Sequence, residues 1–261
     1  MRDKTTRKIA ITGKGGVGKS FITAALALLT AGKGITVLAI DADPDANLAS
    51  ALGIPLESQK EIITIAGHKK LIEERTGAKV QQYGQIFKLN PEVSDIADKY
   101  AFHHRGVDLL VLGAIASGGS GCACPENVLL QALVQDLVLH RGEVLFMDME
   151  PGIEHLGRAT ARGVTSFVVV VEPGIRSLES CRRICAMAKD IGISGIRVIA
   201  NKIRVPADET LIRDAVGTTE ILGFIPYSDA ILSNDRDAKS AIDNLDDNLL
   251  GLFRDIVQKL L

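Results

Sequence analysis

Short apolar runs alternate with longer amphipathic stretches along most of the chain. The apolar runs predict strands at Lys8–Thr12, Thr36–Ile40, Gln85–Leu89, Asp108–Leu112, Glu143–Met147, Phe167–Val171, Arg197–Ala200 and Glu220–Phe224. The longer stretches predict helices at Ser20–Ala31, Ala46–Leu52, Asn127–His140, Arg176–Ile191 and Leu245–Leu261. Continuous β-branched runs separated by helices are typical of parallel strands buried on both faces. The pattern therefore predicts a doubly wound α/β fold, a mostly parallel sheet flanked by helices.

The domain organisation follows from the same pattern. Residues 57–80 have a helical pattern with interruptions near Gly67 and Gly77, and no Pro/Gly/Ser-rich linker, repeat or low-complexity tract divides the chain. The 261 residues, 46% of them hydrophobic, suffice for one large core. We therefore expect residues 1–261 to form a single domain.

Charge and hydropathy exclude some classes of partner. Lys and Arg number 30 against 32 Asp and Glu, which argues against a broad electrostatic footprint for nucleic acid. No apolar run approaches the roughly 18 residues of a membrane span, and the polar N-terminus lacks the apolar stretch of a signal peptide. We expect a cytoplasmic protein with no membrane span and no nucleic-acid partner.

The segment Gly13–Ser20 reads GKGGVGKS and lies between a predicted strand and a predicted helix. It satisfies the P-loop pattern G-x-x-x-x-G-K-[ST] in the context that this pattern requires. Glycines let the backbone N–H groups point at phosphates, and the following helix N-terminus adds its positive dipole end. Lys19 is expected to reach the β- and γ-phosphates and Ser20 to bind Mg²⁺. The nucleotide-binding residues predicted here are Gly15, Gly16, Val17, Gly18, Lys19, Ser20 and Phe21.

Carboxylates follow two of the predicted strands. Asp41, Asp43 and Asp45 come after the second strand, and Asp148 ends the apolar run GEVLFMD. Carboxyl ends of parallel strands form the ligand edge of such a sheet. Asp148 is in the Walker B arrangement, so we expect it to reach Mg²⁺ directly or through water. Gly152, shortly after it, suits a segment that responds to the γ-phosphate.

Four cysteines occur in two pairs. Cys122 and Cys124, in the segment SGGSGCACPEN, are spaced so that both thiols can bind one metal ion. Two ligands do not complete a tetrahedral site, whereas a two-fold dimer supplies four thiolates, which suits Zn²⁺ or Ni²⁺. A redox pair and two incidental loop cysteines remain alternatives. Cys181 and Cys185, four residues apart on a predicted helix, are better explained as buried side chains.

The P-loop contains a second lysine, Lys14, and in this it resembles the deviant Walker A motif of the MinD/nitrogenase-iron-protein class. The resemblance implies that Lys14 crosses a dimer interface to the partner's nucleotide, and that Asp43 positions the attacking water. Lys14, Lys19 and Asp43 are then the catalytic residues. It also implies that Asn201 and the loop near Pro226 hold adenine, with Lys202 beside them. The segment Asn201–Arg204 lacks the final Asp of a guanine signature, which favours ATP.

Several motifs in order along nearly the whole chain resemble the CooC-type ATPases, including the acetyl-CoA-synthase branch called AcsF. They are GKGGVGKS, DADPDANLASALG, the CxC before Pro-Glu-Asn, D-M-x-x-G-I-E-H-L and I-A-N-K. The resemblance implies a homodimeric ATPase that binds Ni²⁺ or Zn²⁺ through Cys122 and Cys124 at the dimer interface. It also implies a maturation factor whose client is a nickel enzyme, carbon monoxide dehydrogenase or acetyl-CoA synthase.

Two other functions remain open from the sequence. The first is a positioning ATPase of the MinD/ParA type acting on membrane or DNA. Membrane-binding members end in a basic amphipathic helix, whereas the amphipathic C-terminal stretch here carries three acidic side chains against two basic ones, which favours a helix packed on the sheet. The second is a reductase similar to the nitrogenase iron protein, with an iron–sulfur cluster between subunits, although such clusters use cysteines far apart in sequence. His103 and His104 are expected in a loop, and His155 follows the Walker B segment.

Overall fold

A computed structural model of the chain describes residues 7–80, 82, 84–113, 124–152, 161 and 163–261. The strands in these ranges form an eight-stranded sheet in the order β3-β4-β2-β5-β1-β6-β7-β8. Their bounds are β1 Lys8–Gly13, β2 Val37–Ala42, β3 Phe102–His104, β4 Val107–Val111, β5 Val144–Met149, β6 Ser166–Val171, β7 Ile196–Ile203 and β8 Glu220–Pro226. The strands pair in parallel except β3, which lies antiparallel at one edge.

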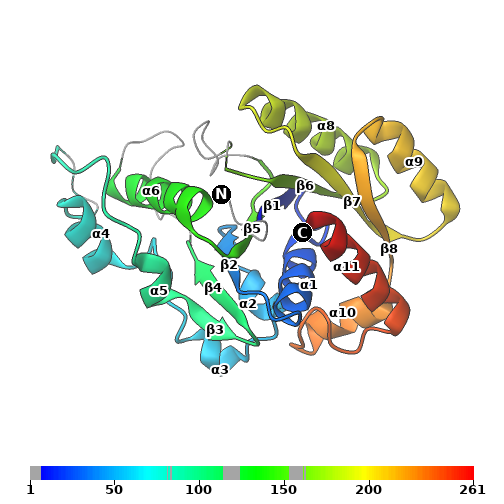
Figure 1. The fold of residues 1–261 in the computed structure, drawn as a ribbon, viewed down its shortest axis with the longest axis horizontal. Helices are drawn as coiled ribbons and strands as arrows, with labels where there is room; N and C mark the ends of the chain where they lie inside the picture. The colour runs from blue at the N-terminus through cyan, green and yellow to red at the C-terminus, as the bar shows by residue number, and fades with distance from the viewer. Residues whose placement is uncertain (1–6, 81, 83, 114–123, 153–160, 162) are drawn as a thin grey trace.

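Helices cover both faces of the sheet (Figure 1). The described helices are α1 Lys19–Ala31, α2 Leu48–Ala51, α3 Leu56–Gln59, α4 Lys69–Thr76, α5 Ile96–Tyr100, α6 Pro125–His140, α8 Ile175–Asp190, α9 Pro206–Val216, α10 Asp229–Arg236 and α11 Asp247–Leu260. Side chains of α4, α5, α6, α8 and α9 join one hydrophobic core, and those of α1, α2 and α11 join the other. The sheet therefore separates two cores, as in other doubly wound folds.

The central strands are mostly apolar because successive side chains enter opposite cores. In β1, Ala10 belongs to the core beneath α6 and α8, whereas Ile9 and Ile11 belong to the core beneath α1 and α11. In β5, Phe146 and Met147 divide in the same way. Every residue of both strands is buried. A strand buried on both faces has no polar positions to spare, which explains the unbroken hydrophobic runs.

Most elements that the sequence predicts are present within a few residues, and the doubly wound α/β fold is confirmed. The helical stretch 57–80 is interrupted as expected, with α3 and α4 on either side of Gly67. The predicted strand Gln85–Leu89 is wrong. Ile86 is 97% exposed, and the Gln85 side chain hydrogen-bonds the backbone of Lys79 and Gln82 instead. An apolar run without a neighbouring strand to pair with does not form a sheet.

Two further differences concern elements that the sequence pattern did not reveal. His103 and His104 belong to β3 and not to a loop, because Arg105 and Gly106 make a two-residue turn with positive φ angles of 49° and 81°. Such a turn joins antiparallel strands. Helix α9 was not predicted, although it begins with Pro206 and the Asp208 carboxylate accepts from the Val205 N–H at 3.1 Å. Both are common signals at a helix start.

Candidate functional site

The P-loop connects β1, at the centre of the sheet, to α1, and its glycines allow close packing there. A Cβ on Gly13 would lie 2.4 Å from the Val170 carbonyl oxygen, and a Cβ on Gly18 would lie 2.5 Å from the Asn201 side-chain nitrogen. Gly16 and Gly18 have φ angles of +81° and +95°, which residues other than glycine rarely adopt. The backbone therefore curls as the phosphate-binding pattern requires.

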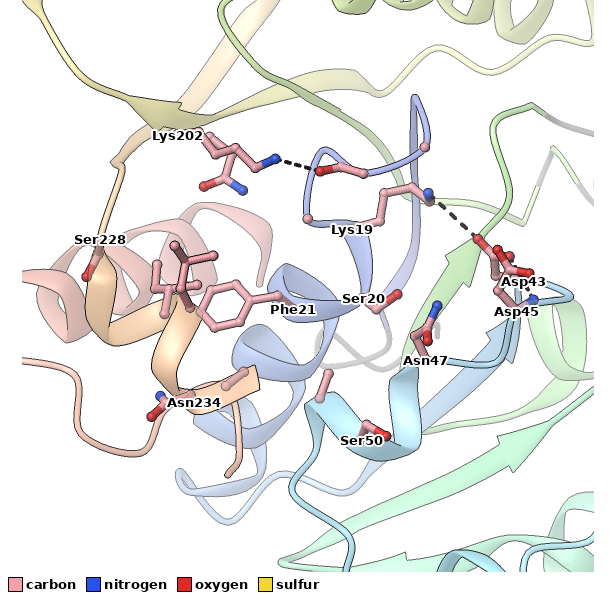
Figure 2. Close-up of a pocket in the computed structure, with 18 of the residues that line it drawn as sticks. Lys19, Ser20, Phe21, Asp43, Asp45, Asn47, Ser50, Lys202, Ser228 and Asn234 are labelled. Atoms are coloured by element: carbon pink, nitrogen blue, oxygen red, sulfur yellow. Dashed lines mark hydrogen bonds and ion pairs between the residues drawn. The ribbon is translucent and has the colours of Figure 1, made fainter. Parts of the chain in front are cut away.

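Lys19 and Asp43 face each other across this loop. The Lys19 ammonium lies 3.7 Å from an Asp43 carboxylate oxygen, and the two side chains are 7% and 14% exposed. Figure 2 shows the Lys19 side chain directed toward Asp43, which follows β2. Both residues were predicted from the sequence, and the fold brings them together because β1 and β2 end at the same edge of the sheet.

Two aspartates lie buried behind them. Asp41 and Asp148 are fully buried and are register partners on β2 and β5. Burial raises the pKa of Asp41 to about 7, with repulsion from Asp148 adding to it. Burial also raises the pKa of Asp148 to about 6, which Ser20 and Lys19 counteract by favouring the charged form.

The two aspartates differ in their hydrogen bonds. One Asp41 oxygen accepts from the Leu48 N–H at 2.9 Å and the other from the Asp43 N–H at 3.3 Å, so this carboxylate holds the start of α2. Neither Asp148 oxygen makes a hydrogen bond of normal geometry, although the Ser20 and Thr23 hydroxyls are near enough to favour its charged form. A buried carboxylate without such partners, close to the Ser20 hydroxyl, suits an oxygen-binding divalent cation such as Mg²⁺.

Residues at the end of β7 hold the other side of the P-loop. The Asn201 amide donates to the Val17 carbonyl oxygen at 2.8 Å and is 5% exposed. The Lys202 ammonium donates to the Gly16 carbonyl oxygen at 2.6 Å and lies 2.9 Å from the Glu172 carboxylate (Figure 2). Asn201 and Lys202 thus contact the P-loop, with which they were expected to bind the same nucleotide.

A cavity of about 760 Å³ joins these groups, a volume within the range of small-molecule and cofactor sites. The sequence-predicted residues that line it are Gly15, Gly16, Gly18, Lys19, Ser20, Phe21, Asp43, Asn201, Lys202 and Pro226. Lys14 is half-buried and does not line this cavity among the described residues, and the buried Val17 and Asp148 do not line it either.

Comparison with known proteins identifies this geometry. The model of the CobQ/CobB/MinD/ParA nucleotide binding domain matches residues 8–240. The carbon monoxide dehydrogenase accessory protein CooC of Rhodospirillum rubrum is 45% identical over 90% of this chain and 89% of the relative. The chain belongs to the CooC-type ATPases. An uncharacterized ATP-binding protein of Methanocaldococcus jannaschii is 44% identical to this CooC-type ATPase over 87% of the chain and 88% of the relative.

The structural neighbours of this CooC-type ATPase support the fold. The MinD cell division protein of Aquifex aeolicus has a TM-score of 0.69 and 21% identity, covering 98% of this chain and 97% of that one. A ParA family ATPase from Chlorobium tepidum also has a TM-score of 0.69, at 18% identity. None of the helices in the described parts of the chain is long and apolar enough to cross a membrane.

The cysteines of this CooC-type ATPase fall in different environments. Cys122 lies outside the described residues, as does His155, and Cys124 is half-buried just before Pro125 opens α6. Among the described residues, no group of three or more His, Cys, Asp or Glu side chains is arranged to hold a metal ion. Cys181 is 4% exposed on α8 and its sulfur lies 3.9 Å from that of Cys185. The prediction of a buried pair is therefore confirmed for Cys181, whereas Cys185 is half-buried.

Two residues near the P-loop escaped the sequence analysis. Glu172 directly follows the apolar strand SFVVVV, which is the same signal that identified Asp148. The Thr12 hydroxyl donates to the Glu150 carbonyl oxygen at 2.8 Å and accepts from the Gly152 N–H at 3.2 Å. No sequence pattern marks Thr12, because a threonine within a strand is common and its partners are distant in sequence.

Proposed function

We propose that this CooC-type ATPase couples ATP binding and hydrolysis in a homodimer to the delivery of nickel into carbon monoxide dehydrogenase or acetyl-CoA synthase. The observation that carries the proposal is the 45% identity, over 90% of this chain, to a protein named as a carbon monoxide dehydrogenase accessory protein. The Cys122-Ala123-Cys124 segment supplies thiols for the metal. Cytoplasmic location is part of the proposal, because the client enzymes would be met there.

Hydrolysis, in which ATP and water give ADP and phosphate, requires that the phosphates be held and the water oriented. We assign Lys19 and the P-loop N–H groups of Gly15 to Phe21 to the phosphates, and Asp43 to the attacking water. Asp43 lies 3.7 Å from the Lys19 ammonium, so the two charges balance each other at the γ-phosphate end of the cavity. Phosphoryl transfer depends mainly on such positioning and charge stabilisation.

Mg²⁺ is assigned to Ser20 and Asp148. The Asp148 carboxylate is buried without a hydrogen-bond partner, and the Ser20 hydroxyl lies at the start of α1. When bound, the cation neutralises charge on the β- and γ-phosphates. Asp41 supports this arrangement by holding the Asp43 N–H at 3.3 Å and the Leu48 N–H at 2.9 Å.

The base end of the cavity favours adenine. The Asn201 amide nitrogen is engaged by the Val17 carbonyl oxygen, which leaves the amide oxygen as an acceptor. An acceptor pairs with the exocyclic amine of adenine and opposes the carbonyl of guanine. Pro226 and Phe21 line the same cavity and supply apolar surface for the ring and ribose.

Dimerisation links the nucleotide to the metal. We propose that Lys14 reaches the partner's nucleotide and that Cys122 and Cys124 of two chains complete one thiolate site for Ni²⁺ or Zn²⁺. The metal-bound and metal-free states then differ in their affinity for the two nucleotides, which is the requirement for coupling. The geometry of the described residues is compatible with this, since Lys14 does not line its own chain's cavity.

The experiment that tests the proposal measures Ni²⁺ affinity by competition with a chromophoric chelator. The parent chain is compared without nucleotide, with ADP and with a non-hydrolysable ATP analogue. The proposal expects the affinity to change between nucleotide states, and Cys122→Ser or Cys124→Ser to remove the binding. A matched Cys181→Ser variant, in the buried pair, should bind nickel as the parent does. Nickel binding that survives both Cys122→Ser and Cys124→Ser would overturn the assignment.

A positioning ATPase acting on membrane or DNA is the second candidate, because the structural neighbours include MinD and ParA proteins. Helix α11 argues against a membrane-binding tail, since Phe253, Ile256 and Val257 pack in the core. Sedimentation with anionic liposomes or with duplex DNA in the presence of ATP distinguishes the two functions. ATP-dependent co-sedimentation would favour the second candidate.

A further inference from the structure

Two consecutive residues at the end of β7 hold two consecutive carbonyl groups of the P-loop. The Asn201 amide nitrogen donates to the Val17 oxygen, and the Lys202 ammonium donates to the Gly16 oxygen. The first contact is 2.8 Å and the second 2.6 Å. Side chains of β7 that line the nucleotide cavity therefore fix the loop at two neighbouring peptide groups.

This contact matters because of how a P-loop binds phosphate. Its N–H groups must point toward the phosphates, so its carbonyl oxygens must point away. A cation on the Gly16 oxygen stabilises that orientation of the peptide group. Gly16 and Gly18, with φ angles of +81° and +95°, otherwise leave this part of the backbone with much conformational freedom.

The Lys202 ammonium has a second partner that keeps it in place. The Glu172 carboxylate lies 2.9 Å from it, and Glu172 follows the last residue of β6, the strand between β1 and β7. The exposed fractions of the lysine and glutamate side chains are 39% and 28%, so the pair is screened only in part. Without the carboxylate, the ammonium would be free to leave the carbonyl for solvent or for the phosphates.

The backbone of Lys202 has an unusual conformation, as expected where the surroundings fix the position of a side chain. Its φ angle is +62°, in the left-handed region that a residue with a side chain adopts only at an energetic cost. Such a conformation persists where the surroundings require it. Here it accompanies a side chain that spans from the end of β7 to the P-loop (Figure 2).

We infer that Glu172 is a positioning residue of the ATPase: it holds the Lys202 ammonium on the Gly16 carbonyl oxygen and so keeps the P-loop in its phosphate-binding form before the nucleotide arrives. Glu172 touches neither the phosphates nor the base in this account. Its contribution is made in binding the phosphates, since the loop is equally well formed in the ground state and in the transition state once ATP is bound.

The test is a double-mutant cycle on ATP hydrolysis and ADP binding with Glu172→Ala, Lys202→Met and the double variant. Each single variant is expected to raise the KM for ATP and the Kd for ADP about tenfold, the equivalent of one charge-assisted hydrogen bond, with kcat within about twofold of the parent. The double variant should be no worse than Lys202→Met alone, because Glu172 acts through the lysine.

Two further variants separate positioning from a structural role. Glu172→Gln keeps an oxygen acceptor of the same length without the charge, so its KM should lie between those of the parent and Glu172→Ala. Glu220→Ala removes a comparable ion pair, 2.9 Å from Arg197 on the same strand β7, and should leave the KM unchanged. The inference is overturned if Glu172→Ala leaves the KM within twofold of the parent, if the effects of the two single variants add, or if kcat falls as much as the KM rises.

Discussion

Asp41 and Asp148 lie opposite each other on neighbouring parallel strands, and both carboxyl groups are fully buried where β2 and β5 end. Burial raises the pKa of Asp41, and repulsion from Asp148 adds to this effect. Two buried like charges without a cation between them oppose folding. The arrangement therefore lowers the stability of the cation-free protein and provides a site that a divalent cation can fill.

Stability should therefore depend on pH through Asp41. Its pKa is about 7 in the folded protein and 3.8 as an ordinary carboxyl, so the folded chain binds the extra proton. The resulting stabilisation is complete below pH 4 and is lost as the pH rises through 7. Urea unfolding in EDTA gives the free energy of unfolding of the parent and of Asp41→Asn. The value for the parent, relative to that for the variant, should be higher at pH 5 than at pH 7.5. A difference that is constant with pH, as expected for the control Asp45→Asn at the exposed position 45, would contradict the account.

The Mg²⁺ requirement should depend on pH through Asp148. Its pKa is raised to about 6, and a proton on this carboxylate competes with the cation. The Mg²⁺ concentration for half-maximal ATP hydrolysis should therefore increase as the pH falls from 7.5 to 5.5. Asp148→Asn should raise that concentration by about tenfold or more at pH 7.5, comparable to losses at other metal sites, and should flatten its pH dependence. An unchanged Mg²⁺ requirement in this variant would remove Asp148 from the site.

Thr12 should tie the P-loop to the segment after β5. Its hydroxyl is the partner of both the Glu150 carbonyl and the Gly152 N–H, and β1 pairs with β5 only as far as Asp148. Thr12→Val keeps the shape but removes the hydroxyl that bonds both segments, at a cost of about 1–3 kcal/mol. We expect a lower melting temperature and about a tenfold lower kcat, both measured against Thr12→Ser, which retains the hydroxyl. Equal behaviour of the two variants would show that the hydroxyl is unimportant.

Lys14 should act on the other subunit. Lys14→Ala is expected to bind ATP nearly as the parent does and to hydrolyse it about 10³-fold more slowly, as when a charge supplied in trans is lost. Mixing Lys14→Ala with Asp43→Asn should restore about a quarter of the parent activity, since half of the dimers then hold one intact site of two. Two inactive variants that stay inactive when mixed, although they form mixed dimers, would place Lys14 in its own chain's site.

The sequence was informative wherever a residue's role depends on its place at a strand end. Asp43, Asp148 and Asn201 were predicted at or just after strand ends, and parallel strands of a doubly wound sheet end at the same edge. In the structure Asp43 follows β2, whereas Asp148 and Asn201 lie among the last residues of β5 and β7. The fold class followed for a similar reason, since strands such as β5, buried on both faces, have an unmistakable composition.

Contacts between segments distant in sequence could not be predicted from the sequence. The Lys202 ammonium contacts Gly16, 186 positions earlier, and nothing in either local pattern specifies that pairing. The short edge strand β3 was missed because its pairing with β4 depends on a two-residue turn at Arg105 and Gly106. Gln85–Leu89 was wrongly predicted as a strand for the converse reason, because an apolar run without a partner strand has nothing to bond to.

The most direct test of the central claim is the number of metal ions per chain, measured together with the mass in solution. The parent chain and a Cys122→Ser/Cys124→Ser variant are loaded with Ni²⁺ and examined without nucleotide, with ADP and with a non-hydrolysable ATP analogue. The account predicts a dimer with about one ion per two chains, lost in the variant and altered in affinity by the nucleotide. A monomer that binds a full ion per chain in every nucleotide state, or a variant that keeps the metal, would contradict it.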